Sequence, residues 1–238
     1  RSRLDVSRSR GFSKFVGRAA EMATLDAALE RALAGHGQVV GLVADAGTGK
    51  SRLCFEFAER CRARGIGVRT ATGVAHGKAV PLLPVLEFYR GVFGITERDS
   101  DAKARQQIAG NVVAADESLV PSLPLLYDFL GVPDPEKPLT IPPGPERQRR
   151  LLALLQRLTI ARGERQPAVI LFEDLHWIDD ATAVFVQNLI DATDTSRTLM
   201  LVNFRPEFRA DWTRRSYYQQ IPLASLGEPA LAEMLADL

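Results

Sequence analysis

The chain has no long apolar run, little cysteine and almost no net charge, and each of these absences narrows the classes to which it can belong. No apolar segment approaches the roughly 20 residues that a helix needs to cross a bilayer, and no signal-peptide pattern is present. Lysine and arginine number 30 against 29 acidic residues, which gives no electrostatic argument for a nucleic-acid or membrane partner. We therefore expect a cytoplasmic protein, with neither a membrane nor nucleic acid as a partner of this domain.

The two cysteines, Cys54 and Cys61, are seven residues apart in a segment with helical spacing. On an α-helix this separation is about two turns, roughly 10 Å along the axis, which is too long for a disulfide. Metal ligation is not expected, because no further cysteine or histidine lies nearby in the sequence. Both side chains are predicted to be reduced and buried.

At 238 residues the chain can bury a core and fits one α/β domain with room for a helical insertion. It begins with Arg1 and stops at Leu238 within a predicted helix, so we expect it to be a piece of a longer polypeptide. Residues 1–14 carry basic side chains among Ser and Gly. They are interpreted as a basic linker from an upstream domain, in preference to a nucleic-acid-binding arm.

The most informative stretch is residues 44–51, ADAGTGKS. It follows an apolar run at 38–43 and precedes a segment whose apolar residues have helical spacing. A strand, a glycine-bearing loop and Gly-Lys-Ser at a helix start form the context of a phosphate-binding P-loop. Glycines let backbone N–H groups curl around an anion, and the helix N-terminus adds unpaired donors and the positive end of its dipole. The sequence therefore predicts a bound nucleotide, ATP or ADP.

Within this loop we expect Lys50 to reach the β- and γ-phosphates and the Ser51 hydroxyl to bind Mg²⁺. Gly47 and Gly49 should matter most for a close phosphate approach. Ala44 departs from the pattern G-x-x-x-x-G-K-[ST], and its Cβ requires a negative φ at that position. The loop residues predicted to contact the nucleotide are Ala46, Gly47, Thr48, Gly49, Lys50 and Ser51.

Four further segments have strand character, and helices are predicted between them. The strand segments are 67–72, 168–172, 198–202 and 219–223. Residues 168–172 are apolar on both alternations, which is typical of a central parallel strand covered on both faces. The chain between 72 and 168 is longer than one crossover helix requires, so we predict a helical insertion at about 84–163.

Two carboxylates, Glu173 and Asp174, follow the strand at 168–172, where open α/β sheets bind ligands. Beside a P-loop, one such carboxylate holds Mg²⁺ and the other polarises the attacking water. We assign Glu173 to the metal and Asp174 to the base, and the alternative is that the pair only caps the next element. Asn203 and Arg205 follow the strand at 198–202 and are placed to read a γ-phosphate, with a surface salt bridge as the alternative for Arg205. His176 is interpreted as a packing residue, and sensing of phosphate or water is left open.

With residues 46–53, 173–179 and 204–208 in this order, the sequence resembles the signal-transduction ATPases with numerous domains (STAND). These are a branch of the AAA-like, origin-recognition-like P-loop ATPases. Residues 15–18 (FVGR) and 212–223 also match. Within this group the chain is most similar to the ATPase domain that follows a class III adenylate or guanylate cyclase domain in many bacterial regulators.

The resemblance implies a three-layer α/β/α fold around a central parallel sheet of order 5-1-4-3-2. It implies that Val16 and Arg18 line the adenine side of the pocket, that Arg52 adds to the P-loop contacts and that Arg205 acts as the sensor-1 arginine. The ATPase core would span 15–223, and 224–238 would begin a truncated helical lid. The implied partners are a fused or neighbouring effector domain, such as a nucleotide cyclase, and a second copy of the chain.

The leading functional hypothesis is a Mg-dependent ATPase that serves as a regulatory switch in signal transduction. It would bind Mg·ATP, hydrolyse it slowly and couple the nucleotide state to association or to an effector domain. One alternative is a scaffold that holds nucleotide without turnover, which the Glu-first acidic pair and Ala44 favour. Another is a DNA-associated AAA ATPase, which would need a basic surface that the charge balance does not indicate. A small-molecule kinase lacks any acceptor-site motif.

Overall fold

The computed structural model describes residues 14–73 and 80–235, so the predicted linker at 1–14 lies outside the described residues except for Lys14. The strands are β1 (Gln38–Val43), β2 (Gly67–Thr72), β3 (Ala168–Glu173), β4 (Thr198–Phe204) and β5 (Tyr218–Pro222). The α-helices are α2 (Ala19–Leu33), α3 (Lys50–Ala63), α4 (Leu83–Phe93), α5 (Asp101–Ala115), α6 (Leu123–Phe129), α7 (Pro145–Arg165), α8 (Asp180–Asp191) and α9 (Glu228–Leu235). Short 3₁₀ turns are η2 (Glu117–Ser122), η3 (Leu175–Trp177) and η4 (Asp211–Arg214).

A parallel sheet forms the centre of the molecule. In the described part of the chain it has five strands in the order β2-β3-β4-β1-β5, which is the predicted 5-1-4-3-2 counted from the other edge. β1 lies between β4 and β5, with Val39 opposite both Met200 and Tyr218. Because all the pairs are parallel, the carboxyl ends of the strands meet at one edge of the sheet. The predicted fold class is confirmed.

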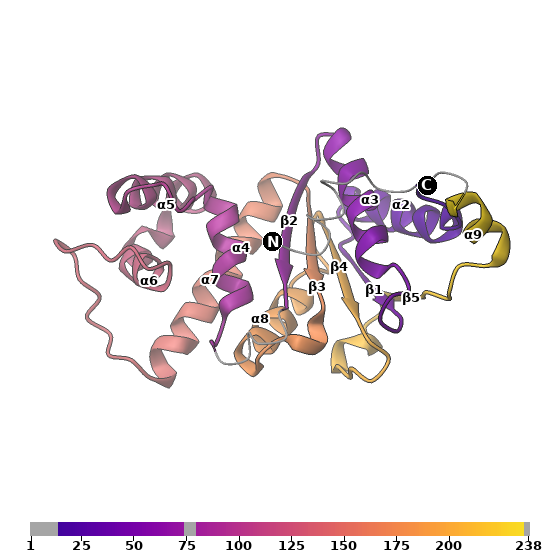
Figure 1. The fold of residues 1–238 in the computed structure, drawn as a ribbon. Helices are drawn as coiled ribbons and strands as arrows, with labels where there is room; N and C mark the ends of the chain where they lie inside the picture. The colour runs from indigo at the N-terminus through magenta and orange to yellow at the C-terminus, as the bar shows by residue number, and fades with distance from the viewer. Residues whose placement is uncertain (1–13, 74–79, 236–238) are drawn as a thin grey trace.

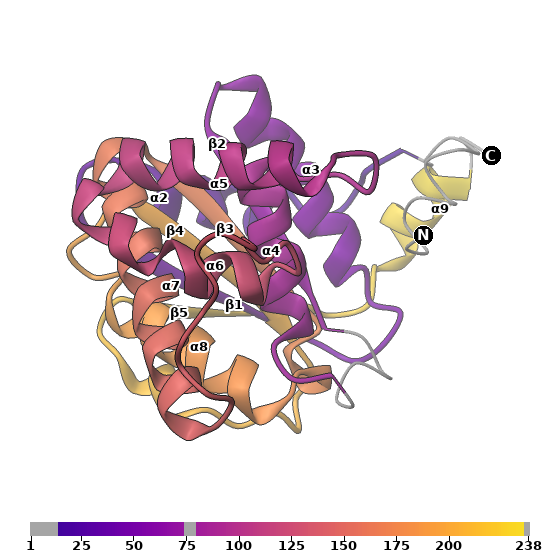
Figure 2. The same ribbon diagram turned by 90° about the vertical axis from the view of Figure 1, so that its left-hand side faces the viewer.

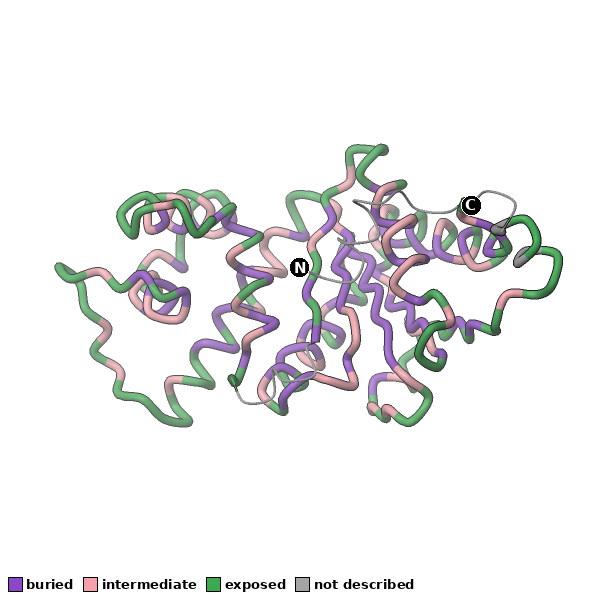
Figure 3. Tube along the Cα trace, in the orientation of Figure 1, coloured by how far each residue is buried: buried purple, intermediate pink, exposed green. Residues whose placement is uncertain are grey.

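Helices cover both faces of the sheet, as Figure 1 shows: α2 and α3 lie on one side, and α4, α7 and α8 lie on the other. The strand residues alternate between two apolar clusters on these faces. On β3, Ile170 and Phe172 belong to the cluster with α4, α7 and α8, whereas Val169 and Leu171 join α2 and α3. This double-sided burial explains why the strand sequences are continuously apolar. Figure 3 shows the same pattern, with buried residues concentrated in the sheet and in the facing sides of the helices.

The stretch predicted as an insertion contains α4 to α7. Of these helices, α4 and α7 lie beside the sheet, and α5 and α6 lie farther out (Figures 1 and 2). Aromatic contacts attach α4 to the sheet layer: Phe88 stacks on Phe172 at 6.0 Å, and Tyr89 meets Phe185 of α8 at 6.2 Å. The helix α4 begins at Leu83, one residue before the predicted insertion, because Pro84 is tolerated in a first helical turn.

Cys54 and Cys61 are both buried and free, as predicted. Burial raises the pKa of the Cys61 thiol to about 11, so the thiol is protonated at neutral pH. Across residues 14–73 and 80–235, no helix is long and apolar enough to cross a membrane.

Candidate nucleotide-binding site

The predicted P-loop connects the end of β1 to the start of α3. Gly47 and Gly49 have left-handed backbone conformations, with φ of 84° and 92°. A Cβ built at either glycine would meet no atom within 4 Å, so glycine is required here by backbone conformation and not by crowding. Left-handed residues within a turn are typical of the backbone nests that bind anions. The loop therefore has the conformation that its sequence predicts.

Lys50, the first residue of α3, is buried within this loop at 7% exposure. Its Nζ donates hydrogen bonds to the carbonyl oxygens of Ala44 at 2.6 Å and Asp45 at 2.8 Å. Burial lowers the pKa of Lys50, and the charge of Asp174 opposes this effect. Ala44 itself is buried, packs in the cluster with α2 and α3, and does not have a positive φ. The alanine is accommodated by the core.

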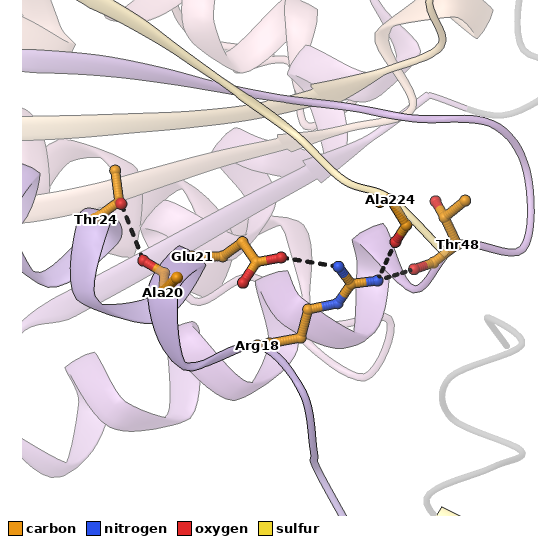
Figure 4. A network of polar contacts seen from close by, with 6 residues as sticks. All are labelled: Arg18, Ala20, Glu21, Thr24, Thr48 and Ala224. Carbon is orange, nitrogen blue, oxygen red and sulfur yellow. Dashed lines mark hydrogen bonds and ion pairs between the residues drawn. The ribbon is translucent and has the colours of Figure 1, made fainter. Parts of the chain in front are cut away.

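Arg18, at the start of α2, contacts the backbone of the P-loop (Figure 4). Its Nη2 donates to the carbonyl oxygen of Thr48 at 2.9 Å and to that of Ala224 at 2.8 Å, and its Nη1 pairs with Glu21 at 2.8 Å. The guanidinium thus joins the start of α2, the P-loop and the segment after β5. Val16, two residues earlier, is buried. Arg18 therefore lies beside the loop with its donors directed to backbone carbonyls, and the adenine contacts of Val16 and Arg18 stay predictions.

Arg52 lies on α3 two residues after Lys50, and its side chain contacts its own helix and the chain before α2. Its guanidinium pairs with Glu56 at 2.7 Å and lies 5.9 Å from the centre of the Phe15 ring. The contact with Phe15 connects α3 to the FVGR segment. These contacts direct Arg52 along α3, so its predicted role in phosphate contact stays a prediction.

The structure brings the two predicted magnesium ligands together. Glu173 ends β3, and Ser51 is the second residue of α3. Burial raises the pKa of Glu173 above its ordinary value, while a hydrogen bond from the Ser51 hydroxyl opposes the increase. A hydroxyl and a carboxylate are oxygen donors of the kind that Mg²⁺ prefers, and Mg²⁺ usually takes its other ligands from phosphates and water. Among the described residues there is no group of three or more His, Cys, Asp and Glu that could hold a metal alone.

Asp174 has an unusual backbone conformation, with φ 56° and ψ 46°. It is one of two non-glycine residues with positive φ in the described chain, and such a conformation costs on the order of 1–3 kcal/mol. Two neighbours hold it. The Asn203 Oδ1 accepts a hydrogen bond from the Asp174 N–H at 2.9 Å. Gly73 approaches so closely that a Cβ there would be 2.5 Å from the Asp174 carbonyl oxygen.

Arg205, His176 and Trp177 lie near the acidic pair. The Arg205 guanidinium is 5.5 Å from the centre of the Trp177 ring, and its charge contributes to lowering the pKa of Lys50. Its predicted alternative, a surface salt bridge, is represented by one contact to Glu207 at 4.0 Å. Burial lowers the pKa of His176, and neither of its ring nitrogens has a hydrogen-bond partner within the described residues. The imidazole is therefore neutral at pH 7.

Two further residues hold this site: Asn203, for which the sequence predicted another role, and Gly73, which sequence reasoning did not assign. Asn203 is fully buried on β4, and its Nδ2 lies 3.4 Å from Glu173 and 3.5 Å from Cys54 Sγ. Its position at the end of the apolar run TLMLVNF predicted that it reads a γ-phosphate; that role stays a prediction, and the contact to the Asp174 N–H was not expected. No local sequence signal identifies Gly73, because its importance depends on the approach of Asp174, the residue that follows β3.

The parallel sheet and the glycine loop at its carboxyl edge define an α/β domain with a P-loop-like fold. The family is specified by the sequence: residues 14–202 match the model of the AAA ATPase domain. The chain belongs to this family. AAA ATPase domains are a nucleotide-binding class, so membership implies nucleotide binding and suggests ATPase activity.

Individual relatives share limited identity with the chain. An uncharacterized protein of Rhizobium meliloti (strain 1021) is 28% identical over 207 residues, which covers 83% of this chain and 19% of that protein. The chain therefore spans about a fifth of that relative. Two solved structures are similar at low TM-scores. A STAND protein with a tetratricopeptide repeat sensor from Pyrococcus horikoshii has a TM-score of 0.45 at 14% identity, over 93% of this chain and 26% of that one. The structure of Drosophila ORC bound to DNA has a TM-score of 0.43 at 13% identity, and the match covers 99% of this chain and 50% of that one.

Proposed function

We propose that this domain binds Mg·ATP at the carboxyl edge of the sheet and hydrolyses it slowly, as a nucleotide-dependent switch in a larger signalling protein. The proposal rests on the proximity of three groups at the P-loop: the Lys50 ammonium, the Ser51 hydroxyl and the Glu173 carboxylate. The Lys50 ammonium lies in the glycine loop, and the Ser51 hydroxyl bonds to the half-buried Glu173 carboxylate. Cation, hydroxyl and carboxylate in this order are what a phosphate chain with a divalent ion requires.

The loop residues would hold the phosphates through their backbone N–H groups, and Lys50 would pair with the β- and γ-phosphate oxygens. Ser51 and Glu173 would hold Mg²⁺, which neutralises charge on the phosphates when bound. A bound cation also offsets the burial that raises the pKa of Glu173. Glu173 thus fits the ion both in its ligand chemistry and in its charge.

The remaining predicted residues complete the site in this proposal. Asp174 would orient and deprotonate the attacking water, and Arg205 would stabilise charge on the γ-phosphate. Val16 and Arg18 would lie on the adenine side, with Arg52 beside the P-loop. The Glu-first order of the acidic pair supports slow turnover. The core would comprise 15–223, the lid would begin at 224–238, and the partners would be an effector domain, such as a nucleotide cyclase, and a second copy.

The nucleotide content of the purified protein tests binding. We would denature the wild type and Lys50→Ala and identify what each releases, with Lys103→Ala on α5 as the matched control because Lys103 is exposed and pairs with Asp99, outside the P-loop. ADP or ATP retained by the wild type and the control, and lost from Lys50→Ala, would support the proposal. A protein purified empty would be titrated with Mg·ATP. Undiminished nucleotide affinity in Lys50→Ala, or no uptake by the wild type, would overturn it.

Turnover is tested separately with Asp174→Asn, which distinguishes an ATPase from a scaffold that only holds nucleotide. Asparagine tolerates the left-handed conformation of this position, so the backbone should be kept while the carboxylate is lost. Removal of a general base typically lowers the rate by about 10²–10⁴-fold. We expect the variant to retain nucleotide and to lose hydrolysis. Equal rates of phosphate release from the variant and the wild type would contradict the assignment of Asp174.

A further inference from the structure

A cavity separate from the P-loop lies at the opposite edge of the sheet. It has a volume of about 290 Å³ and is lined by the first residues of two strands, Gly67 of β2 and Ala168 of β3, together with residues of α4, α5 and α7. Lys50 and Glu173 belong to the carboxyl edge, whereas this cavity opens at the amino ends of the parallel strands. The nucleotide site proposed above does not include it.

The cavity has arginines and no carboxylate in its lining. Arg69, Arg162 and Arg165 line it, and neither aspartate nor glutamate does. Within the described chain none of the three forms an ion pair. Arg162 Nη1 donates to Asn111 Oδ1 at 2.7 Å, and Arg69 Nη1 donates to the backbone carbonyl of Val68 at 3.2 Å. The polar contacts of both guanidiniums are therefore with neutral groups.

This arrangement leaves positive charge uncompensated in a partly buried place. Burial lowers the pKa of Arg162, and the charge of Arg69 lowers it further. Arginine stays protonated nevertheless, because its ordinary pKa is above about 12. Two like charges that are partly desolvated repel each other, and an anion between them would relieve both effects. A planar guanidinium also matches the two oxygens of a carboxylate or phosphate.

The other wall of the cavity is apolar. Phe88, Val92 and Ile170 line it, and so does the ring of Tyr89, whose hydroxyl already bonds to the Leu155 carbonyl oxygen at 2.5 Å. These side chains are mostly buried already, and a bare inorganic ion would leave the space beside them unfilled. The volume is near the lower end of the range of about 300–1,000 Å³ that is usual for ligand pockets, which suits a body the size of one ring.

We propose that this cavity binds a small organic anion, with its carboxylate or phosphate group between Arg69 and Arg162 and its apolar body against Phe88 and Ile170. The arginines on one wall would bind the anionic group, and the apolar side chains on the other wall would contact the body of the ligand. The proposal does not depend on the proposed nucleotide site, because no residue of the P-loop lines the cavity.

Isothermal titration calorimetry of the whole chain tests the proposal with four probes: phenylacetate, phenyl phosphate, inorganic phosphate and benzyl alcohol. We expect phenylacetate or phenyl phosphate to bind, and the preferred one identifies the anionic group. The neutral alcohol should not bind, and inorganic phosphate should bind at least about tenfold more weakly than the preferred probe, since one guanidinium–oxyanion contact and the buried ring each contribute at least about 1.4 kcal/mol. Absence of binding by both aromatic anions at millimolar concentration would overturn the proposal, as would equal binding of benzyl alcohol.

Variants locate the binding. Arg69→Gln and Arg162→Gln should each weaken it at least about tenfold, whereas Arg157→Gln, on α7 but paired with Asp116, should not. Ala114→Phe fills the cavity from the exposed face of α5 and tests the site without touching the arginines, with Ala102→Phe on the same helix as its control. Lys50→Ala should bind the anion as the wild type does, which separates this result from the test of nucleotide binding. Unchanged affinity in Arg162→Gln and in Ala114→Phe would contradict the assignment.

Discussion

The side-chain oxygen of Asn203 accepts a hydrogen bond from the backbone N–H of Asp174 at 2.9 Å. This bond joins the end of β4 to the residue after β3 and supports a left-handed conformation that an aspartate rarely adopts. Asn203 is fully buried, so its loss leaves the Asp174 N–H without a partner. The position of the carboxylate proposed as the base depends on this asparagine.

Asn203→Leu keeps the size of the side chain and removes its hydrogen bonds. We expect the free energy of unfolding to fall by about 1–3 kcal/mol, the usual cost of an unpaired buried donor. ATP hydrolysis should fall more than nucleotide affinity, because the P-loop is not touched. Urea unfolding and phosphate release measure the two effects. Asn188→Leu, on the partly exposed α8 surface, is the control, and equal losses in both variants would contradict the prediction.

Gly67 begins strand β2, and Gly73 follows its last residue. The two glycines differ in what surrounds them. A Cβ at Gly73 would meet the Asp174 carbonyl oxygen at 2.5 Å, whereas one at Gly67 would meet nothing within 4 Å. Gly73→Ala should therefore displace Asp174 and lower the hydrolysis rate, together with a loss of stability of about 1–3 kcal/mol. Gly67→Ala should leave both unchanged. A Gly73→Ala protein with wild-type turnover would show that Asp174 is not held as described.

Glu173 predicts a pH dependence of stability. Burial raises its pKa from the ordinary value of 4.5, so above pH 4.5 the folded protein retains a proton that the unfolded chain releases. Its contribution to stability therefore decreases as the pH rises through this interval. Without nucleotide, Glu173→Gln should be more stable than the wild type at pH 7, by about 0.5–2 kcal/mol, and the difference should shrink toward pH 4.5. Urea unfolding at a series of pH values measures it.

Glu146 on α7 serves as the control, because its pKa is shifted in the opposite direction from that of Glu173. A hydrogen bond from Arg150 lowers its pKa, so Glu146→Gln should not stabilise the protein at neutral pH. Glu173→Gln should also require a higher Mg²⁺ concentration for hydrolysis, because one of the proposed ligands is lost while Ser51 and the phosphates remain. If Glu173→Gln were less stable than the wild type at pH 7, the burial described for this carboxylate would be wrong.

Arg18→Lys tests whether the contacts of the Arg18 guanidinium order the P-loop. A lysine keeps the charge but cannot reproduce the planar fork that reaches Thr48, Ala224 and Glu21 together. We expect the free energy of unfolding to fall by about 1.5–3 kcal/mol and nucleotide affinity to fall with it, because the loop loses an anchor. Arg31→Lys on α2, where the guanidinium bonds to exposed glutamines, should change neither. Wild-type affinity in Arg18→Lys would exclude a role in ordering the loop.

Much of the fold could be predicted from the sequence, because the signals are local. Apolar runs such as 168–172 mark strands that are buried on both faces, and alternation assigns their residues to the two helical layers. Boundaries moved by one to four residues: β5 begins at Tyr218 instead of 219, and α7 ends at Arg165, four residues after the end at 161 that the apolar spacing indicates. The ends of helices and strands are harder to predict, because capping and edge contacts determine them and these contacts depend on neighbouring elements in the fold.

The sequence by itself determined the glycine loop, the lysine at a helix start and the acidic pair at a strand end, since each follows from neighbouring residues and backbone chemistry. Only the tertiary structure decided that Arg18 reaches Ala224, 206 residues away, that Asn203 holds Asp174, and that Arg69 and Arg162 face one cavity. These contacts join segments that are distant in the chain. Their existence depends on the order of the strands and on the packing of the helices over them, which no local pattern specifies.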